Sequence, residues 1–201
     1  MKFIIATHNK SKLRELSRIL EPLGIEAVTD RDLGIELPEV DETGTTFAEN
    51  AFLKADSACR FSGLPAIADD SGIVVNALGG APGVYSARYG GPDLDDEGRN
   101  RLLLKEMDGV EWEKRTAHYA CAVCCVFPEG ETIAVEGEMH GFVGTEQHGD
   151  GGFGYDPLFY VKQADGSFIT SAQLTDDEKD AISHRGNALR ALKHELLKRM
   201  G

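Results

Sequence analysis

The sequence has 201 residues, 41% of them hydrophobic and 27% charged, which is typical of a soluble globular domain long enough to bury its own core. Its formal net charge of −13 argues against a nucleic-acid polymer as partner, because such binding needs a basic face. The sequence has no apolar run of the roughly 20 residues that cross a bilayer, so no membrane partner is expected.

The N-terminal segment and the cysteines favour a cytoplasmic protein. Residues 1–7 become polar too early for a signal peptide. Four cysteines do not make a disulfide scaffold in a chain of this length, and Cys121, Cys124 and Cys125 share one strand-like run. Their Cys-x-x-Cys spacing also occurs in zinc sites, but no second pair follows at a suitable spacing. We therefore interpret them as reduced thiols.

A strand, a turn and a helix are predicted at the start of the chain. Residues Lys2–Thr7 resemble a buried strand, and Lys10–Leu20 follows as a helix with leucines at helical spacing. The turn presents Thr7 and Asn9 beside a helix N-terminus, where phosphate binds readily. The alternative is a plain cap, with Asn9 as N-cap and Lys12 in solvent. The absence of a glycine-rich phosphate loop favours that alternative.

A second strand, Ile25–Thr29, leads through an acidic irregular segment into a second helix. Thr46 and Glu49 have the spacing of a capping box, and Gly63 is a good C-terminal glycine, so they predict where this helix begins and ends. Lys54 lies two turns into the helix. A lysine there is more often a surface residue than a ligand.

The segment Pro65–Gly72 combines a buried strand with two acids. A short apolar run reads as a strand that stops at Asp69 and Asp70, before another strand at Ile73–Val75. Two acids at a strand end indicate a metal ion or a general base. A polar turn is the alternative, because Asp, Ser and Gly are common turn residues. If both acids are extended, their side chains point to opposite faces, and only one enters a site directly.

Arg88 follows a tight glycine-rich loop at 79–83. A guanidinium in this setting either clamps a phosphate or carboxylate or makes a structural salt bridge. Farther along, the pattern predicts a helix at 93–107 and two antiparallel strands at 116–127 and 132–142.

The segment Gly149–Asp156 places four glycines around two aromatic residues. Glycines allow close approach of the backbone to a ligand, and Phe153 and Tyr155 have the rings to stack on a flat base. Asp156 has the oxygens to accept hydrogen bonds from a ring N–H. A flexible surface loop is the alternative, but it fits bulky aromatics between glycines poorly.

The C-terminal part is predicted to be two helices with a break between them. A capping box at Thr175 opens the first, which carries Lys179, and residues 182–186 interrupt it. The final amphipathic helix is expected at about 187–200. His184 and Arg185 are hydrogen-bond donors at this junction.

Six of these segments, in the same order, carry a resemblance that runs nearly end to end. The chain resembles the non-canonical purine nucleoside triphosphate pyrophosphatases, the ITPase or XTP/dITP diphosphatase family. The segments are residues 7–12, 42–50, 68–72, 78–83 with 86–88, 151–156, and Lys179 with 183–185.

The resemblance implies an α/β fold with an elongated, twisted, mixed sheet and flanking helices, which form two lobes around a central cleft in a single domain spanning residues 1–201. It implies a homodimer, Mg²⁺ as cofactor, and a small purine nucleoside triphosphate as substrate. The implied reaction hydrolyses ITP, dITP and XTP at the α–β bond to the monophosphate and pyrophosphate.

The resemblance also implies roles for residues that match its motifs. Asp70 would be the general base and a metal ligand with Glu42, and Lys54 and Asp69 would assist catalysis. Glu39 and Asp41, beside Glu42, leave the second metal-site acid ambiguous. The implied substrate-binding residues are Thr7, His8, Asn9, Lys10, Ser11, Lys12, Ser71, Arg88, Phe153, Gly154, Tyr155, Asp156, Lys179, His184 and Arg185. His8 departs from the small residue expected at its position.

This assignment makes chemical sense and leaves two alternatives. A triphosphate must be neutralised locally in an acidic protein, which the lysines, Arg88 and Mg²⁺ would do. Donors at His184 and Arg185 would select a 6-keto over a 6-amino purine. The alternatives are a related pyrophosphatase for other modified nucleotides and a non-catalytic nucleotide sensor.

Overall fold

The computed structural model describes residues 2–200. The strands are β1 Lys2–Ile5, β2 Glu26–Val28, β3 Ala66–Val75, β4 Thr116–Val126, β5 Thr132–Val143, β6 Phe159–Lys162 and β7 Phe168–Thr170. The α-helices are α1 Lys10–Leu20, α2 Phe47–Ser62, α3 Asp96–Glu106, α4 Asp176–Ile182 and α5 His184–Met200. None of these helices is long and apolar enough to span a membrane.

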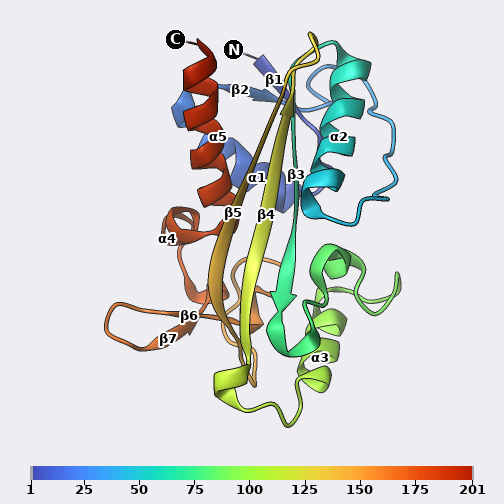
Figure 1. Cartoon of the computed structure of the whole chain (residues 1–201). Helices are drawn as coiled ribbons and strands as arrows, with labels where there is room; N and C mark the ends of the chain where they lie inside the picture. Colours follow the sequence, from blue (N-terminus) through green and yellow to red (C-terminus); the bar gives the residue numbers. More distant parts are fainter. Residues whose placement is uncertain (1, 201) are drawn as a thin grey trace. The chain divides into compact units, whose positions relative to one another are not determined.

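The strands form a mixed sheet in the order β2-β1-β3-β4-β5-β6-β7 (Figure 1). β1 runs parallel to β2 and to β3, with Ile4 opposite Val28 and Ile5 opposite Ile67. β6 pairs antiparallel with β5 and β7. The predicted α/β class with a mixed sheet and flanking helices is confirmed. The strands β6 and β7 are additions to it that are too short, at four and three residues, to show a periodic pattern.

The described chain divides into two compact units built from discontinuous segments. Unit 1 comprises residues up to 70, residues 121–137 and residues from 184 onward, and unit 2 comprises residues 71–120 and 138–183. β3, β4 and β5 each contribute residues to both units. The single undivided domain expected from the sequence stays a prediction.

Unit 1 has an apolar cluster on each face of its strands. On the first face α1 and α5 cover a cluster that includes Phe3, Ile67, Val123, Leu16 and Leu192. On the second face α2 covers Ile4, Ala66, Ala68, Ala122 and Ala55 (Figure 1). Successive residues of β1 and of β3 thus alternate between the two faces, as the pleat of a strand requires.

The helix ends of unit 1 form by the local rules that the sequence predicts. Asn9 caps α1, because its Oδ1 accepts hydrogen bonds from the backbone N–H groups of Ser11 at 2.9 Å and Lys12 at 3.1 Å. Thr46 and Glu49 form the predicted capping box of α2, which ends at Gly63 in the left-handed conformation. The predicted limits of α1, Lys10 and Leu20, are confirmed.

The predicted break after Asp69 and Asp70 is wrong, because β3 continues from Ala66 to Val75 as one strand. Gly72 in this strand is required by close packing rather than by a turn. A Cβ built there would lie 2.3 Å from Ser86 Oγ and 2.4 Å from the carbonyl oxygen of Gly83. The Ser86 hydroxyl fills that space, where it accepts a hydrogen bond from Ile73 N at 2.9 Å.

Unit 2 has its own apolar core, which includes Ile73, Leu103, Tyr119, Tyr155 and Phe159. The predicted capping box at Thr175 and Glu178 opens α4, as expected. The predicted start of the last helix is wrong, because α5 begins at His184 rather than near Asn187. His184 and Arg185 therefore lie in the first turn of α5, directly after the junction with α4 at Ser183.

Candidate active site

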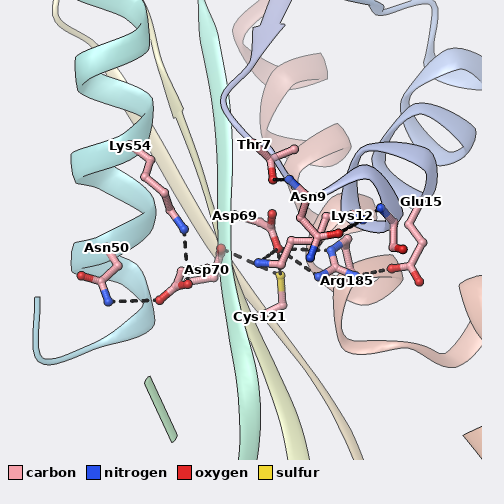
Figure 2. A network of polar contacts seen from close by, with 12 residues as sticks. Thr7, Asn9, Lys12, Glu15, Asn50, Lys54, Asp69, Asp70, Cys121 and Arg185 are labelled. Atoms are coloured by element: carbon pink, nitrogen blue, oxygen red, sulfur yellow. Dashed lines mark hydrogen bonds and ion pairs between the residues drawn. The ribbon is translucent and has the colours of Figure 1, made fainter. Parts of the chain in front are cut away.

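Asp69 and Asp70 lie at successive positions of β3, and their side chains point to opposite faces (Figure 2). Asp69 points toward Lys12 and Arg185, and Asp70 points toward Asn50 and Lys54 (Figure 2). Both carboxylates are buried, with exposed fractions of 1% and 6%. Strand periodicity thus creates two polar centres in unit 1, one on each face of the strand.

The centre on the α1 face is built on one oxygen of Asp69. Asp69 Oδ2 accepts from Lys12 Nζ at 3.1 Å and from Arg185 Nε and Nη2 at 3.2 and 3.1 Å. Arg185 Nη1 pairs with Glu15, so the guanidinium links α5 to both β3 and α1. The Arg185 side chain is 1% exposed, and the neighbouring carboxylates hold its pKa above the usual arginine value in spite of burial.

The charge balance of this centre keeps Asp69 ionised. Burial alone raises the pKa of Asp69, but the Lys12, Arg185 and Lys54 cations outweigh it and hold that pKa well below the ordinary 3.8. The Cys121 thiol lies 3.9 Å from Asp69 Oδ2. Burial and the Asp69 charge raise the thiol pKa to about 12, so the sulfur stays protonated and donates weakly to the carboxylate.

The centre on the α2 face is more open and holds Asp70. Asp70 Oδ2 accepts from Asn50 Nδ2 at 3.1 Å, and Asp70 Oδ1 accepts from Lys54 Nζ at 3.3 Å. Lys54 also donates to Glu42 Oε1 at 2.9 Å. Asn50 Oδ1 in turn accepts from Gly44 N at 2.8 Å, which ties the loop before α2 to Asp70.

The two aspartates have opposite pKa shifts. Burial raises the pKa of Asp70 above 3.8, and the Lys54 and Lys12 cations only partly offset this effect. Burial alone lowers the pKa of Lys54, but Asp70, Asp69 and Glu42 outweigh it and hold the pKa above 10.5. Neighbouring acids with separated pKa values are typical of a site that moves a proton, and Asp70 is the better base of the two.

Glu42 and Asp70 together fit one hard divalent cation. Both place a carboxylate oxygen on the same ammonium group, that of Lys54, whereas Glu39 and Asp41 are exposed. No group of three or more His, Cys, Asp or Glu side chains in residues 2–200 has the arrangement of a metal cage. Mg²⁺ usually takes one or two carboxylates and completes its shell with water and substrate phosphates, so an oxygen pair is a fitting donor set.

The predicted phosphate turn is a capped helix start in which the N-cap already uses two backbone donors. Thr7 Oγ1 accepts from Asn9 N at 3.2 Å, and Asn9 binds the Ser11 and Lys12 N–H groups. His8 and Lys10 are exposed. The expectation that Asn9 is the N-cap is confirmed, and phosphate binding at this turn stays a prediction. The expectation of a solvated Lys12 is wrong, because its ammonium is bound to Asp69.

In unit 2 the loop before β6 forms its own charged contact. Asp156 Oδ2 accepts from Lys179 Nζ and from Phe153 N, both at 2.8 Å. Lys179 Nζ also lies 5.0 Å from the centroid of the Phe153 ring. Gly152 leaves room for this carboxylate, since a Cβ there would come within 2.1 Å of Asp156 Oδ2. The predicted residues Phe153, Asp156 and Lys179 are thus brought together.

The other predicted residues of unit 2 have different surroundings. Tyr155 is buried in the core, and its hydroxyl donates to the Ser86 carbonyl at 2.9 Å. Arg88 is exposed, with its guanidinium carbon 5.0 Å from the Tyr85 ring centroid. Ser71 is half-buried on β3. Gly154 is bound by side chains of α3.

The structure adds Asn50, Glu15 and Cys121 to the polar centres. Asn50 carried a signal, because asparagine is a poor helix former and here lies one turn before Lys54 on the same helix face. Glu15 lies three residues after Lys12 on α1, which also places the two on one face. Cys121 gave no such signal, because its contact with Asp69 depends on the pairing of distant strands.

The fold and the centres on β3 define an α/β protein in which two buried carboxylates are paired with lysine and arginine cations. Residues 3–195 match the model of the Ham1 family, and the chain belongs to that family.

Three proteins illustrate the similarity. The chain is 50% identical to a dITP/XTP pyrophosphatase from an Exiguobacterium species over 98% of this chain and 97% of that protein. The structure of a HAM1 protein from Coxiella burnetii superimposes with a TM-score of 0.86 at 37% identity, covering 98% of this chain and 99% of that one. A nucleoside-triphosphatase, also called a dITP/XTP pyrophosphatase, from Mycobacterium abscessus gives a TM-score of 0.76 at 46% identity, covering 96% and 98%.

Proposed function

We propose that this chain is a dITP/XTP pyrophosphatase that hydrolyses dITP, XTP and ITP to the monophosphate and pyrophosphate, and so removes non-canonical purines from the nucleotide pool. Similarity over nearly the full length to proteins of that name supports the proposal. The observation in this chain that carries it is the pair of buried aspartates on β3, one held by Lys12 and Arg185 and the other by Asn50 and Lys54.

Asp70 is the general base in this proposal. Its carboxylate takes a proton from the water that attacks the α-phosphorus, and pyrophosphate leaves on the opposite side. Asn50 and Lys54 each hold one carboxylate oxygen, which fixes the direction of the group. Burial raises the pKa of Asp70, which makes its carboxylate a stronger base than that of an exposed aspartate.

Lysine and arginine side chains neutralise the negative charge of the triphosphate in this proposal. Lys12, Lys54, Lys179 and Arg88 supply positive charge in a chain whose net charge is −13. Glu42 and Asp70 would hold Mg²⁺, which supplies further neutralisation of the phosphates and of the leaving group when bound. The backbone and side chains of residues 7–12 and Ser71 are proposed phosphate contacts.

Stacking on the base is assigned to the aromatic loop of unit 2. Phe153 offers a half-buried ring for stacking, and Asp156 and Lys179 offer an acceptor and a donor beside it. The family resemblance also assigns His184 as a donor for the 6-keto oxygen of hypoxanthine and xanthine, whereas the Arg185 guanidinium is already bound by Asp69 and Glu15. Sites built on such hydrogen bonds reject analogues that lack the matching group by as much as ~10⁴-fold.

We also propose a homodimer that works in the cytoplasm. The dimer rests on the family resemblance. Cys59, Cys121, Cys124 and Cys125 are all free and buried, which fits a reducing compartment.

The deciding experiment measures the products from dITP and XTP with Mg²⁺. Pyrophosphate and monophosphate are expected, and orthophosphate alone would contradict cleavage of the α–β bond. Asp70→Asn keeps the shape of the side chain and should lower kcat at least ~10³-fold with an unchanged circular dichroism spectrum. Asp93→Asn, at an exposed aspartate outside the proposed site, is the matched control. Tight dITP binding without turnover by the wild-type chain would instead indicate a nucleotide sensor.

A further inference from the structure

The backbone N–H and C=O groups of Gly154 are both bound by side chains of α3. Gly154 N donates to Asp96 Oδ2 at 2.9 Å, and the Gly154 carbonyl oxygen accepts from Asn100 Nδ2 at 3.0 Å. The two side chains are four residues apart and therefore lie on one face of the helix. The glycine sits in the left-handed region with φ +62, and it directly follows Phe153.

Asp96 and Asn100, which together bind the Gly154 backbone, are called the clamp below. Other residues of α3 hold Asp96 and the start of the helix in place. Asp96 Oδ1 accepts from Arg99 Nη2 at 2.6 Å, and Asp95 caps the helix through Gly98 N at 2.8 Å. Partial burial raises the pKa of Asp96, but the hydrogen bonds from Arg99 and Gly154 outweigh it, so the carboxylate is ionised at neutral pH. The acceptor that meets the Gly154 N–H is therefore charged and fixed in direction.

Asn100 is expected to lower the stability of α3 at its position, so its contact with Gly154 needs a reason. It is 2% exposed within a helix, where asparagine is a weak former, and its Oδ1 has no hydrogen-bond partner among residues 2–200. A small apolar residue would avoid both costs. Within the described part of the chain, the hydrogen bond that its amide makes to another element is the bond to the Gly154 carbonyl.

The backbone that the clamp holds directly follows Phe153, the aromatic residue of the loop. The Phe153 N–H donates to Asp156. On the other side of Phe153, the Gly154 N–H donates to Asp96 of α3. The Phe153 ring is half-buried and lies under the Lys179 ammonium. The Phe153 backbone is thus fixed at both ends before any ligand arrives.

We propose that Asp96 and Asn100 of α3 are positioning residues, which hold the Gly154 peptide so that the Phe153 ring is preorganised for the purine base. The inference rests on the proposed function, in which Phe153 stacks on that base. Without the clamp, the loop must be ordered during binding, and that cost appears in substrate affinity rather than in the chemical step.

The test compares Asn100→Ala and Asp96→Ala with Glu97→Ala. Glu97 lies in the same helical turn and carries the same charge, but its contacts are with Arg101 and Gln147 at the surface. We expect KM for dITP to rise about 5- to 10-fold in both clamp variants, with kcat within about twofold of wild type, because each loses one hydrogen bond to the loop. Glu97→Ala should leave both constants unchanged. Asp96→Asn restores an acceptor and should recover most of the affinity.

A double-variant cycle separates positioning from simple stability. In a Phe153→Ala background, removal of Asn100 should raise KM by less than about twofold, because the ring that it positions is gone. Full multiplication of the two effects, or a lower melting temperature with unchanged KM, would overturn the positioning role.

A measurement without substrate keeps the inference separate from the activity. Hydrogen exchange at the Gly154 amide should be faster in Asp96→Ala and unchanged in Glu97→Ala. Unchanged exchange in both would overturn the clamp. A wild-type chain that does not turn over dITP would contradict the proposed function, whereas turnover with unaltered KM in the clamp variants would contradict the positioning role alone.

Discussion

Two adjacent residues of the same type have different chemistry because they face opposite sides of one strand. Asp69 is surrounded by cations and has a lowered pKa, and Asp70 is buried beside one close ammonium and has a raised pKa. The difference comes from their surroundings on α1, α2 and α5 and not from the aspartates themselves.

The opposite pKa shifts predict how the two carboxyl groups titrate. Carbon-13 NMR of the aspartate side chains in metal-free protein should show Asp70 titrating above 3.8 and Asp69 below it. Lys54→Gln should raise the Asp70 pKa further, because the Lys54 ammonium favours the ionised carboxylate. A lower Asp70 pKa in that variant would contradict the proposed charge balance.

The lowered pKa of Asp69 predicts how the stability of the protein changes in acid. The pKa of Asp69 is lower in the folded than in the unfolded chain, so its contribution is complete above the unfolded value near 3.8 and is lost as the pH falls below it. Asp69→Asn should reduce the free energy of unfolding by roughly 3–5 kcal/mol at pH 7, because Arg185 and Lys12 lose a buried partner. Its stability should also depend less on pH below 4 than that of wild type. Urea unfolding at several pH values measures both, with Asp41→Asn as the exposed control.

At the scale of elements, the helix caps determine the register of α1 and α2 and so the face on which their functional side chains lie. The capping box at Thr46 starts α2 in the register that puts Asn50 and Lys54 on the face toward Asp70. The Asn9 cap starts α1 so that Lys12 and Glu15 face β3 and α5. Short polar motifs near the helix starts therefore set the direction of groups that lie one or two turns later.

Removal of the Thr46 cap tests this connection. Thr46→Ala should reduce the free energy of unfolding by about 1 kcal/mol, because the Glu49 N–H loses its side-chain acceptor. Thr46→Ser keeps the hydroxyl and should remain within about 0.5 kcal/mol of wild type. Thermal unfolding of the three proteins is the measurement, and equal losses in both variants would argue against the cap.

At the scale of the whole molecule, an acidic chain places three cations against two buried acids. The net charge is −13, yet Lys12, Lys54 and Arg185 all pair with the two aspartates of β3. The charge distribution, rather than the total charge, is therefore what suits a small anionic ligand and disfavours a polyanion. Unit 2 adds a separate pair, Lys179 and Asp156, beside an aromatic ring.

Local sequence determined the parts of this protein that depend on neighbours along the chain. The limits of α1, the capping boxes of α2 and α4, and the long strands β4 and β5 follow from periodicity and caps, whose interactions span only a few residues. The six motifs that carry the family resemblance are also readable from the sequence. The opposite directions of Asp69 and Asp70 follow from strand pleat once the strand is known to continue.

Tertiary structure decided the rest, because those contacts join residues far apart in the chain. β3 continues through Gly72 since Ser86, from another segment, occupies the space that a side chain would need. Arg185 pairs with Asp69 across 116 positions and with Glu15 across 170, and no local pattern encodes such partners. The same holds for the contact of Asn100 with Gly154. The sequence identified the acids as candidates, and the packing of α1, α2 and α5 on β3 determined which partners and pKa shift each one has.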